Sequence, residues 1–107
     1  MIRRATIRKI AKEIARHFRP RRIVLFGSYA RGDATENSDL DFLVVVERCG
    51  PAGRRSAPII EMLAREYALP IDVVVRPEKA VRCWRNVPGS FLHRVLAEGV
   101  VLYEPKA

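Results

Sequence analysis

The chain of 107 residues contains little cysteine and no long apolar run. Its two cysteines, Cys49 and Cys83, lack a C-x-x-C spacing, which argues against a zinc site or a redox pair and indicates free thiols in a reducing compartment. No apolar run approaches the roughly 18 residues of a membrane span, and the amino terminus lacks the apolar core of a secretory signal. The sequence therefore predicts a soluble, cytoplasmic protein without a membrane partner.

The chain is also short, and it contains neither an internal repeat nor a low-complexity tract. With 107 residues and 49% hydrophobic content it can close one core, so we expect a single domain over residues 1–107. A separate domain for a second substrate does not fit in this length. Such a substrate would dock on the domain itself or be held by a partner.

Acidic residues are scarce relative to basic ones, with 12 Asp and Glu against 20 Lys and Arg and a net charge of +8. The first 22 residues hold many of the arginines, and only Glu13 opposes them there. Such a charge suits nucleic acid, a triphosphate or an acidic partner protein. Alternatively, these cations form the solvated face of an amphipathic first helix, and we favour this interpretation.

Hydrophobic periodicity predicts an α/β fold in which helices flank a small mixed β-sheet. Apolar residues at helical spacing predict a helix over residues 4–19 that ends before Pro20. The other expected elements are strands over 22–26, 40–47, 71–75 and 100–103, the last at an edge, and helices over 57–68 and 90–98. Residues 77–88 give no clear signal, and residues 48–55 are predicted to form a basic loop.

The first predicted strand ends abruptly at Gly27, which Ser28 follows. Glycine lets the backbone approach a ligand closely, and Ser28 suits the cap of a short helix that begins at Tyr29. The start of a helix presents free N–H groups to an anion, and Arg31 adds a charge to the same place. The segment predicts a phosphate-binding turn, although Gly27 and Ser28 alone are equally typical of an ordinary strand-to-helix connection.

Three aspartates accompany the predicted strands. The spacing of Asp39 and Asp41 puts both carboxylates on one face of a strand, and Asp72 interrupts the apolar run 71–75. Because a buried, unpaired carboxylate is unfavourable, we expect the three to share one polar site. Magnesium prefers oxygen ligands and bridges carboxylates to phosphates, so the pattern predicts a metal triad. An ordinary turn would explain Asp39 but not the other two.

The ordered set of turn, arginine, paired aspartates and later strand aspartate resembles the minimal nucleotidyltransferases of the DNA polymerase β superfamily, a group often paired with HEPN-domain toxins. The resemblance runs over about residues 23–75, with a family-like ending at 97–104. It implies the polymerase β-like nucleotidyltransferase fold. It also implies that Gly27 and Ser28, helped by Arg31, hold the triphosphate of ATP.

The resemblance further implies the catalytic roles. Asp39 and Asp41 would bind two Mg²⁺ ions, and Asp72 would be the third ligand and the general base. The implied reaction moves AMP from ATP to a hydroxyl, with a tyrosine of a HEPN toxin as acceptor, so that the chain acts as an antitoxin. Two alternatives stay open: an antitoxin that neutralises its partner by binding alone, and an enzyme that modifies nucleic-acid ends. The sequence indicates neither the nucleotide preference nor the oligomeric state.

Overall fold

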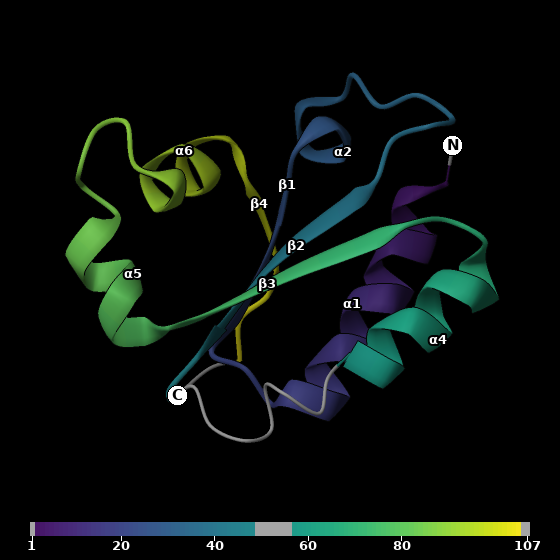
Figure 1. Ribbon diagram of the computed structural model, residues 1–107, viewed down its shortest axis with the longest axis horizontal. Helices are drawn as coiled ribbons and strands as arrows, with labels where there is room; N and C mark the ends of the chain where they lie inside the picture. Colours follow the sequence, from purple (N-terminus) through teal and green to yellow (C-terminus); the bar gives the residue numbers. More distant parts are fainter. Residues whose placement is uncertain (1, 49–56, 106–107) are drawn as a thin grey trace.

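A four-stranded sheet forms the centre of the protein, and helices pack against both of its faces (Figure 1). The computed structural model describes residues 2–48 and 57–105. In chain order the elements are α1 (Arg4–Phe18), β1 (Arg22–Phe26), α2 (Ser28–Arg31), β2 (Leu40–Val46), α4 (Ala57–Tyr67), β3 (Ile71–Pro77), α5 (Glu78–Trp84), α6 (Phe91–Glu98) and β4 (Val100–Tyr103).

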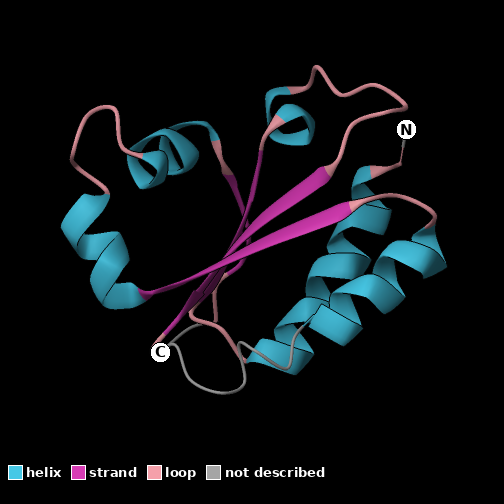
Figure 2. Cartoon of the chain, viewed as in Figure 1, coloured by secondary structure: helices cyan, strands magenta, loops and turns pink. Residues whose placement is uncertain are grey.

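The strands lie in the order β3-β2-β1-β4. β1 is antiparallel to both β2 and β4, whereas β2 and β3 are parallel. Parallel neighbours need a crossover connection, and α4 lies in the one between β2 and β3 (Figure 2). This mixed sheet between helices confirms the predicted α/β class, and β4 occupies the expected edge.

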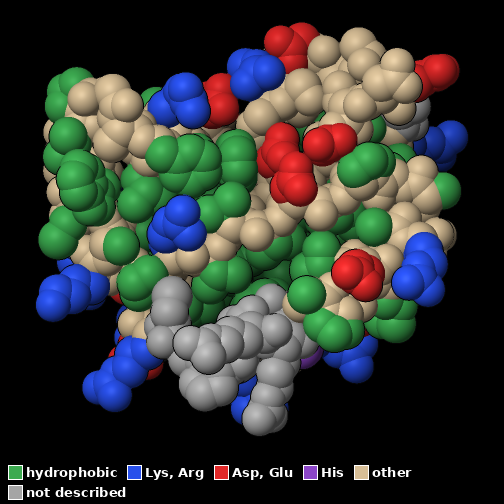
Figure 3. Space-filling model, in the orientation of Figure 1, with side chains coloured by type: hydrophobic (Ala, Val, Ile, Leu, Met, Phe, Trp, Pro, Cys, Tyr) green, Lys and Arg blue, Asp and Glu red, His purple; other side chains and the backbone are tan. Residues whose placement is uncertain are grey.

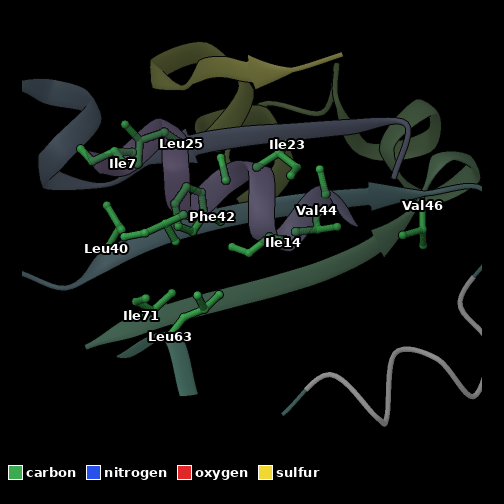
Figure 4. Packing of buried hydrophobic residues seen from close by; sticks show 13 residues of the cluster. Ile7, Ile14, Ile23, Leu25, Leu40, Phe42, Val44, Val46, Leu63 and Ile71 are labelled. Atoms are coloured by element: carbon green, nitrogen blue, oxygen red, sulfur yellow. The ribbon is translucent and has the colours of Figure 1, made fainter. Parts of the chain in front are cut away.

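Alternate residues of the strands contribute to two separate hydrophobic cores. The larger core lies beneath α1 and α4, and its strand residues include Ile23, Leu25, Leu40, Phe42, Val44 and Val46 (Figure 4). The smaller core lies beneath α5 and α6, and its strand residues include Val24, Leu43 and Val45. Since neighbouring strand residues point to opposite faces, Asp41 shares the α5–α6 face with Leu43.

α1 has the amphipathic character that the sequence predicts. Its buried face consists of Ile7, Ile10, Ala11, Ile14 and Ala15. Its exposed cations include Arg4, Arg8, Lys9, Lys12 and Arg16. The helix ends where Arg19 adopts a left-handed φ of 48° and its N–H bonds to the carbonyl of Ala15. Pro20 then prevents continuation of the helix.

The predicted element ends lie within two residues of the observed ones, but two local details differ. Ser28 is not the cap of α2; Gly27 takes that position, and Ser28 is the first helical residue without a side-chain capping bond. The chain turns one residue earlier than expected because Gly27 adopts φ 76° and ψ −158°, which glycine tolerates. The second difference is α5, which forms where the sequence gave no clear signal.

The cysteines take no part in a described bond. Cys83 is an exposed free thiol, whereas Cys49 and most of the expected basic loop at 48–55 lie outside the described residues. Among the helices that the structure describes, none combines the length and the apolar character needed to cross a membrane.

Candidate functional site

Two of the predicted site aspartates lie side by side on neighbouring strands. Asp41 of β2 and Asp72 of β3 are register partners, and Phe26 of β1 is paired with Asp41 on its other side. Asp39 precedes β2 directly and is exposed. Acidic side chains gather beside a hydrophobic area on the face of the molecule shown in Figure 3. The parallel pairing thus brings together carboxylates that are 31 residues apart in the chain.

Crowding changes the ionisation of this group. Burial is the largest influence on Asp41, and the charges of Asp72 and Asp39 and a hydrogen bond with Asp72 act in the same direction. Together they raise the pKa of Asp41 from 3.8 to about 6, while the charge of Arg31 opposes them. Asp41 and Asp72, which are register partners and whose charges interact, form an acid pair at the end of the sheet.

Gly27 lies directly against Asp41 of this pair. A Cβ atom at Gly27 would come within 2.3 Å of the Oδ2 atom of Asp41. The backbone at Gly27 also adopts a positive φ of 76°, which other residues rarely take. The position therefore requires glycine for two reasons, the turn of the backbone and the closeness of the carboxylate.

The short helix α2 places Arg31 above the turn. The carbonyl of Gly27 accepts the N–H groups of Ala30 and Arg31 at 3.1 and 3.0 Å, which closes the first turn. The Nε atom of Arg31 donates to Oδ2 of Asp33 at 3.3 Å. The turn, Ser28 and Arg31 thus form one compact unit at the end of β1, next to the acid pair.

Glu98, the last residue of α6, is part of the site although the sequence did not single it out. Its Oε2 atom accepts a hydrogen bond from Nη1 of Arg31 at 3.2 Å, and its Oε1 atom accepts one from the N–H of Gly27 at 3.4 Å. The Glu98 contact is the largest of the influences that raise the pKa of Arg31. Glu98 is far in sequence from the turn and from the aspartates, and no motif surrounds it. Only its place in the family-like ending at 97–104 could have pointed to it.

The chemistry of the acid group fits a divalent cation. Hard oxygen ligands suit Mg²⁺, and a bound cation would offset the burial and the like charges that raise the pKa of Asp41. Within residues 2–48 and 57–105, no three His, Cys, Asp or Glu side chains are grouped closely enough to form a ready-made metal site. Asp41 and Asp72 are paired in register, and Asp39 lies near enough for its charge to act on Asp41. Mg²⁺ commonly takes one or two carboxylates together with substrate phosphates, which such a pair can provide for.

Comparison with known proteins matches this chain to nucleotidyltransferases. The model of the nucleotidyltransferase domain family matches residues 7–97. A putative protein adenylyltransferase of Methanocaldococcus jannaschii is 37% identical over 79 residues, which are 74% of this chain and 75% of the relative. A second one from that organism is 36% identical over 93 residues, covering 79% of this chain and 80% of the relative. Protein adenylyltransferase MntA of Thermococcus cleftensis is 38% identical over 65 residues, covering 61% and 65%.

A solved structure has a similar fold. It is a crystal structure of a toxin–antitoxin with AMP-PNP, which matches with a TM-score of 0.61 over 92% of this chain and 74% of that chain. The two sequences are 23% identical, so this likeness concerns the fold alone. It agrees with the nucleotidyltransferase fold that the sequence predicts.

Proposed function

Because this chain belongs to the nucleotidyltransferase domain family and is a nucleotidyltransferase, we propose that it transfers AMP from ATP to a hydroxyl group of a partner protein. The observation that carries the proposal is the Asp41–Asp72 acid pair, in which Asp41 lies against Gly27 and within reach of the charge of Arg31. Several relatives are named protein adenylyltransferases, which supports a protein as acceptor and AMP as the transferred group.

The proposed partner is a HEPN-type toxin, with one of its tyrosines as the acceptor and this chain as the antitoxin. Support comes from the structural neighbour, which is a toxin–antitoxin with AMP-PNP. The sequence resemblance to minimal nucleotidyltransferases points to the same pairing. A HEPN tyrosine would supply the hydroxyl that a small nucleotidyltransferase needs from outside its own fold.

In the proposed reaction the hydroxyl oxygen of the acceptor attacks the α-phosphorus of ATP. A new O–P bond forms, the bond to the oxygen that bridges to the β-phosphate breaks, and pyrophosphate leaves. Asp72 takes the hydroxyl proton as general base, and Gly27, Ser28 and Arg31 hold the triphosphate. Asp39, Asp41 and Asp72 would hold two Mg²⁺ ions, which when bound supply Lewis-acid stabilisation of the phosphates.

The test measures transfer of label from ATP labelled at the α-phosphate, in the presence of Mg²⁺ and the co-purified partner. Asp41→Asn removes a charged ligand without changing its shape, so we expect transfer to fall by about a hundredfold or more while the fold is kept. Glu36→Gln, an exposed change in the connection between α2 and β2, serves as the matched control and should transfer at the wild-type rate. Unchanged transfer by Asp41→Asn would contradict the assignment.

The same experiment separates the alternatives. Label on a tyrosine of the partner, found by mass spectrometry, supports the proposal. Label on RNA instead identifies an enzyme that modifies nucleic-acid ends, for which the exposed cations of α1 would supply the binding surface. If no label appears and an Asp39→Ala/Asp41→Ala double variant still suppresses the partner, the protein neutralises by binding alone.

A further inference from the structure

Glu98 connects two parts of the phosphate-binding unit that are distant from it in sequence. It is separated by 71 residues from Gly27 and by 67 residues from Arg31. One carboxylate oxygen accepts the Gly27 N–H at 3.4 Å, and the other accepts Nη1 of Arg31 at 3.2 Å. A single side chain therefore fixes both the backbone of the turn and the arginine that follows it.

The position of Glu98 is not explained by its own helix. A carboxylate at the carboxyl end of a helix lies at the negative end of the helix dipole, which is unfavourable. The last turn of α6 has no basic residue to compensate. The side chain is nevertheless only 23% exposed, against 48% for Arg31. Its partners outside α6 therefore account for its presence.

Gly99 holds the end of α6 close to the strand that leads into the turn. A Cβ atom at Gly99 would come within 2.4 Å of Cγ1 of Val24 and 3.1 Å of the carbonyl oxygen of Leu25. Because no side chain intervenes, α6 ends directly against β1, whose last residue precedes Gly27. The backbone thus delivers Glu98 to the turn on a packed element rather than on a loop.

We propose that Glu98 is a positioning residue for the nucleotide, which fixes Arg31 and the Gly27 turn before the triphosphate binds. The inference rests on the proposed nucleotidyl transfer. A free arginine side chain has many rotamers and loses that freedom when it is held on a phosphate, so an arginine that is already ordered loses less on binding. Glu98 accepts a hydrogen bond from Nη1 of Arg31, and Asp33 accepts one from Nε. Among the described residues, the Nη2 atom of Arg31 has no hydrogen-bond partner. That nitrogen is left for a phosphate.

The opposite role is a competitor that occupies the phosphate-binding groups until ATP displaces it. Removing a competitor tightens nucleotide binding, whereas removing a positioning residue weakens it. The two roles therefore differ in the sign of the effect, which a binding measurement decides.

The experiment titrates the protein calorimetrically with Mg²⁺ and the ATP analogue that has a methylene group between its α- and β-phosphates. We expect Glu98→Ala to bind it about three- to tenfold more weakly, the loss typical of one ordered side chain. Glu98→Gln keeps one oxygen acceptor, which can serve only one of the two donors, and should recover part of this loss. Glu61→Ala, an exposed change on α4, is the matched control and should bind like the wild type.

A double-mutant cycle separates positioning from general stabilisation. In an Arg31→Met background, Glu98→Ala should cause a clearly smaller further loss, because one of the two groups that it positions is gone and only its contact with the Gly27 N–H remains. Equal losses in both backgrounds, or tighter binding by Glu98→Ala, would overturn the inference. The wild type serves as the reference. If the wild type does not bind the analogue, the proposed function fails as well. If the wild type and Glu98→Ala bind it equally well, only the inference about Glu98 is rejected.

Discussion

The two faces of the sheet are built from the same strands but differ in what they can do. The face beneath α1 and α4 is a continuous hydrophobic core in which Leu40 and Phe42 are fully buried. The face beneath α5 and α6 has a smaller core that includes Leu43 and Val45, and at its end the strands place Asp41 and Asp72. One face therefore carries most of the packing, which leaves the end of the other available for acidic side chains.

The contrast is sharpest between two neighbouring residues of β2. Asp41 and Phe42 are adjacent in sequence, yet one belongs to an acid pair and the other has no exposed surface. Because successive strand residues point in opposite directions, the strand that anchors the core also holds the carboxylate rigidly. A rigid strand is a better support for a reactive group than a loop.

The largest effect on stability should come from the α1–α4 face. Phe42→Ala removes a fully buried aromatic ring and leaves a cavity, so we expect the free energy of unfolding to fall by about 3–5 kcal/mol. Urea denaturation followed by circular dichroism measures this loss. Asp41→Asn is the matched control at the next position and should keep a cooperative transition. A loss below about 1 kcal/mol for Phe42→Ala would break the distinction between the faces.

An intermediate effect is expected at the turn beside the acid pair. Gly27→Ala forces a side chain into a backbone region that only glycine adopts readily, which costs about 1–3 kcal/mol. It also pushes a methyl group toward the carboxylate of Asp41, so the rate of AMP transfer should fall by more than the loss of stability alone explains. Thermal unfolding and the labelling assay measure the two losses.

Gly32→Ala is the control for this variant. Gly32 also has a positive φ, 87°, but a Cβ atom there meets no atom within 4 Å. The Gly32→Ala variant should therefore lose stability through backbone strain while keeping nucleotide transfer. Equal activity losses in both variants would show that closeness to Asp41 is not what matters at Gly27.

The smallest effect should be a dependence of stability on pH. The folded protein raises the pKa of Asp41 to about 6, above 3.8, so it binds this proton more tightly than the unfolded chain does. The resulting stabilisation is complete below about pH 4 and is lost as the pH rises through about 6. Asp41→Asn cannot ionise, so with a chelator present its Tm should exceed that of the wild type at pH 8.

This advantage should disappear near pH 4, where the wild-type carboxyl group is protonated. Thermal unfolding scans between pH 4 and pH 8 measure it, with Glu36→Gln as a control for the loss of one negative charge. An Asp41→Asn variant that is less stable than the wild type at pH 8 would contradict the crowding of the acid pair. Added Mg²⁺ should stabilise the wild type more than Asp41→Asn, because the ion relieves repulsion only where the carboxylate is present.

Much of the architecture follows from local patterns. The apolar spacing in residues 4–19 and the β-branched runs at 22–26 and 71–75 predicted elements that the structure confirms, since their periods are those of a helix and of strands. α5 was not predicted, because residues 77–88 have a proline at each end and no clear period. The prediction that Ser28 caps α2 was wrong, because the backbone angles of Gly27 decide where this helix begins.

The roles of the site residues have a different standing. Gly27, Arg31 and the three aspartates were singled out from residue type and spacing, and the structure places Asp41, Asp72 and Gly27 together. Their parts in binding ATP and metal, and in transfer, stay predictions. The link from Glu98 to Arg31 could not be foreseen, because a hydrogen bond across 67 residues leaves no periodic trace in the sequence.

The sequence by itself determined all the helices and strands except α5, the two faces of β2 and the predicted reactive side chains, because these depend on the order and spacing of neighbouring residues. The tertiary structure decided the parallel pairing that sets Asp41 opposite Asp72, and with it the raised pKa of Asp41. It also decided that α6 ends against β1 and brings Glu98 to the turn. These features depend on contacts between distant segments, which form only when the chain packs around a common core.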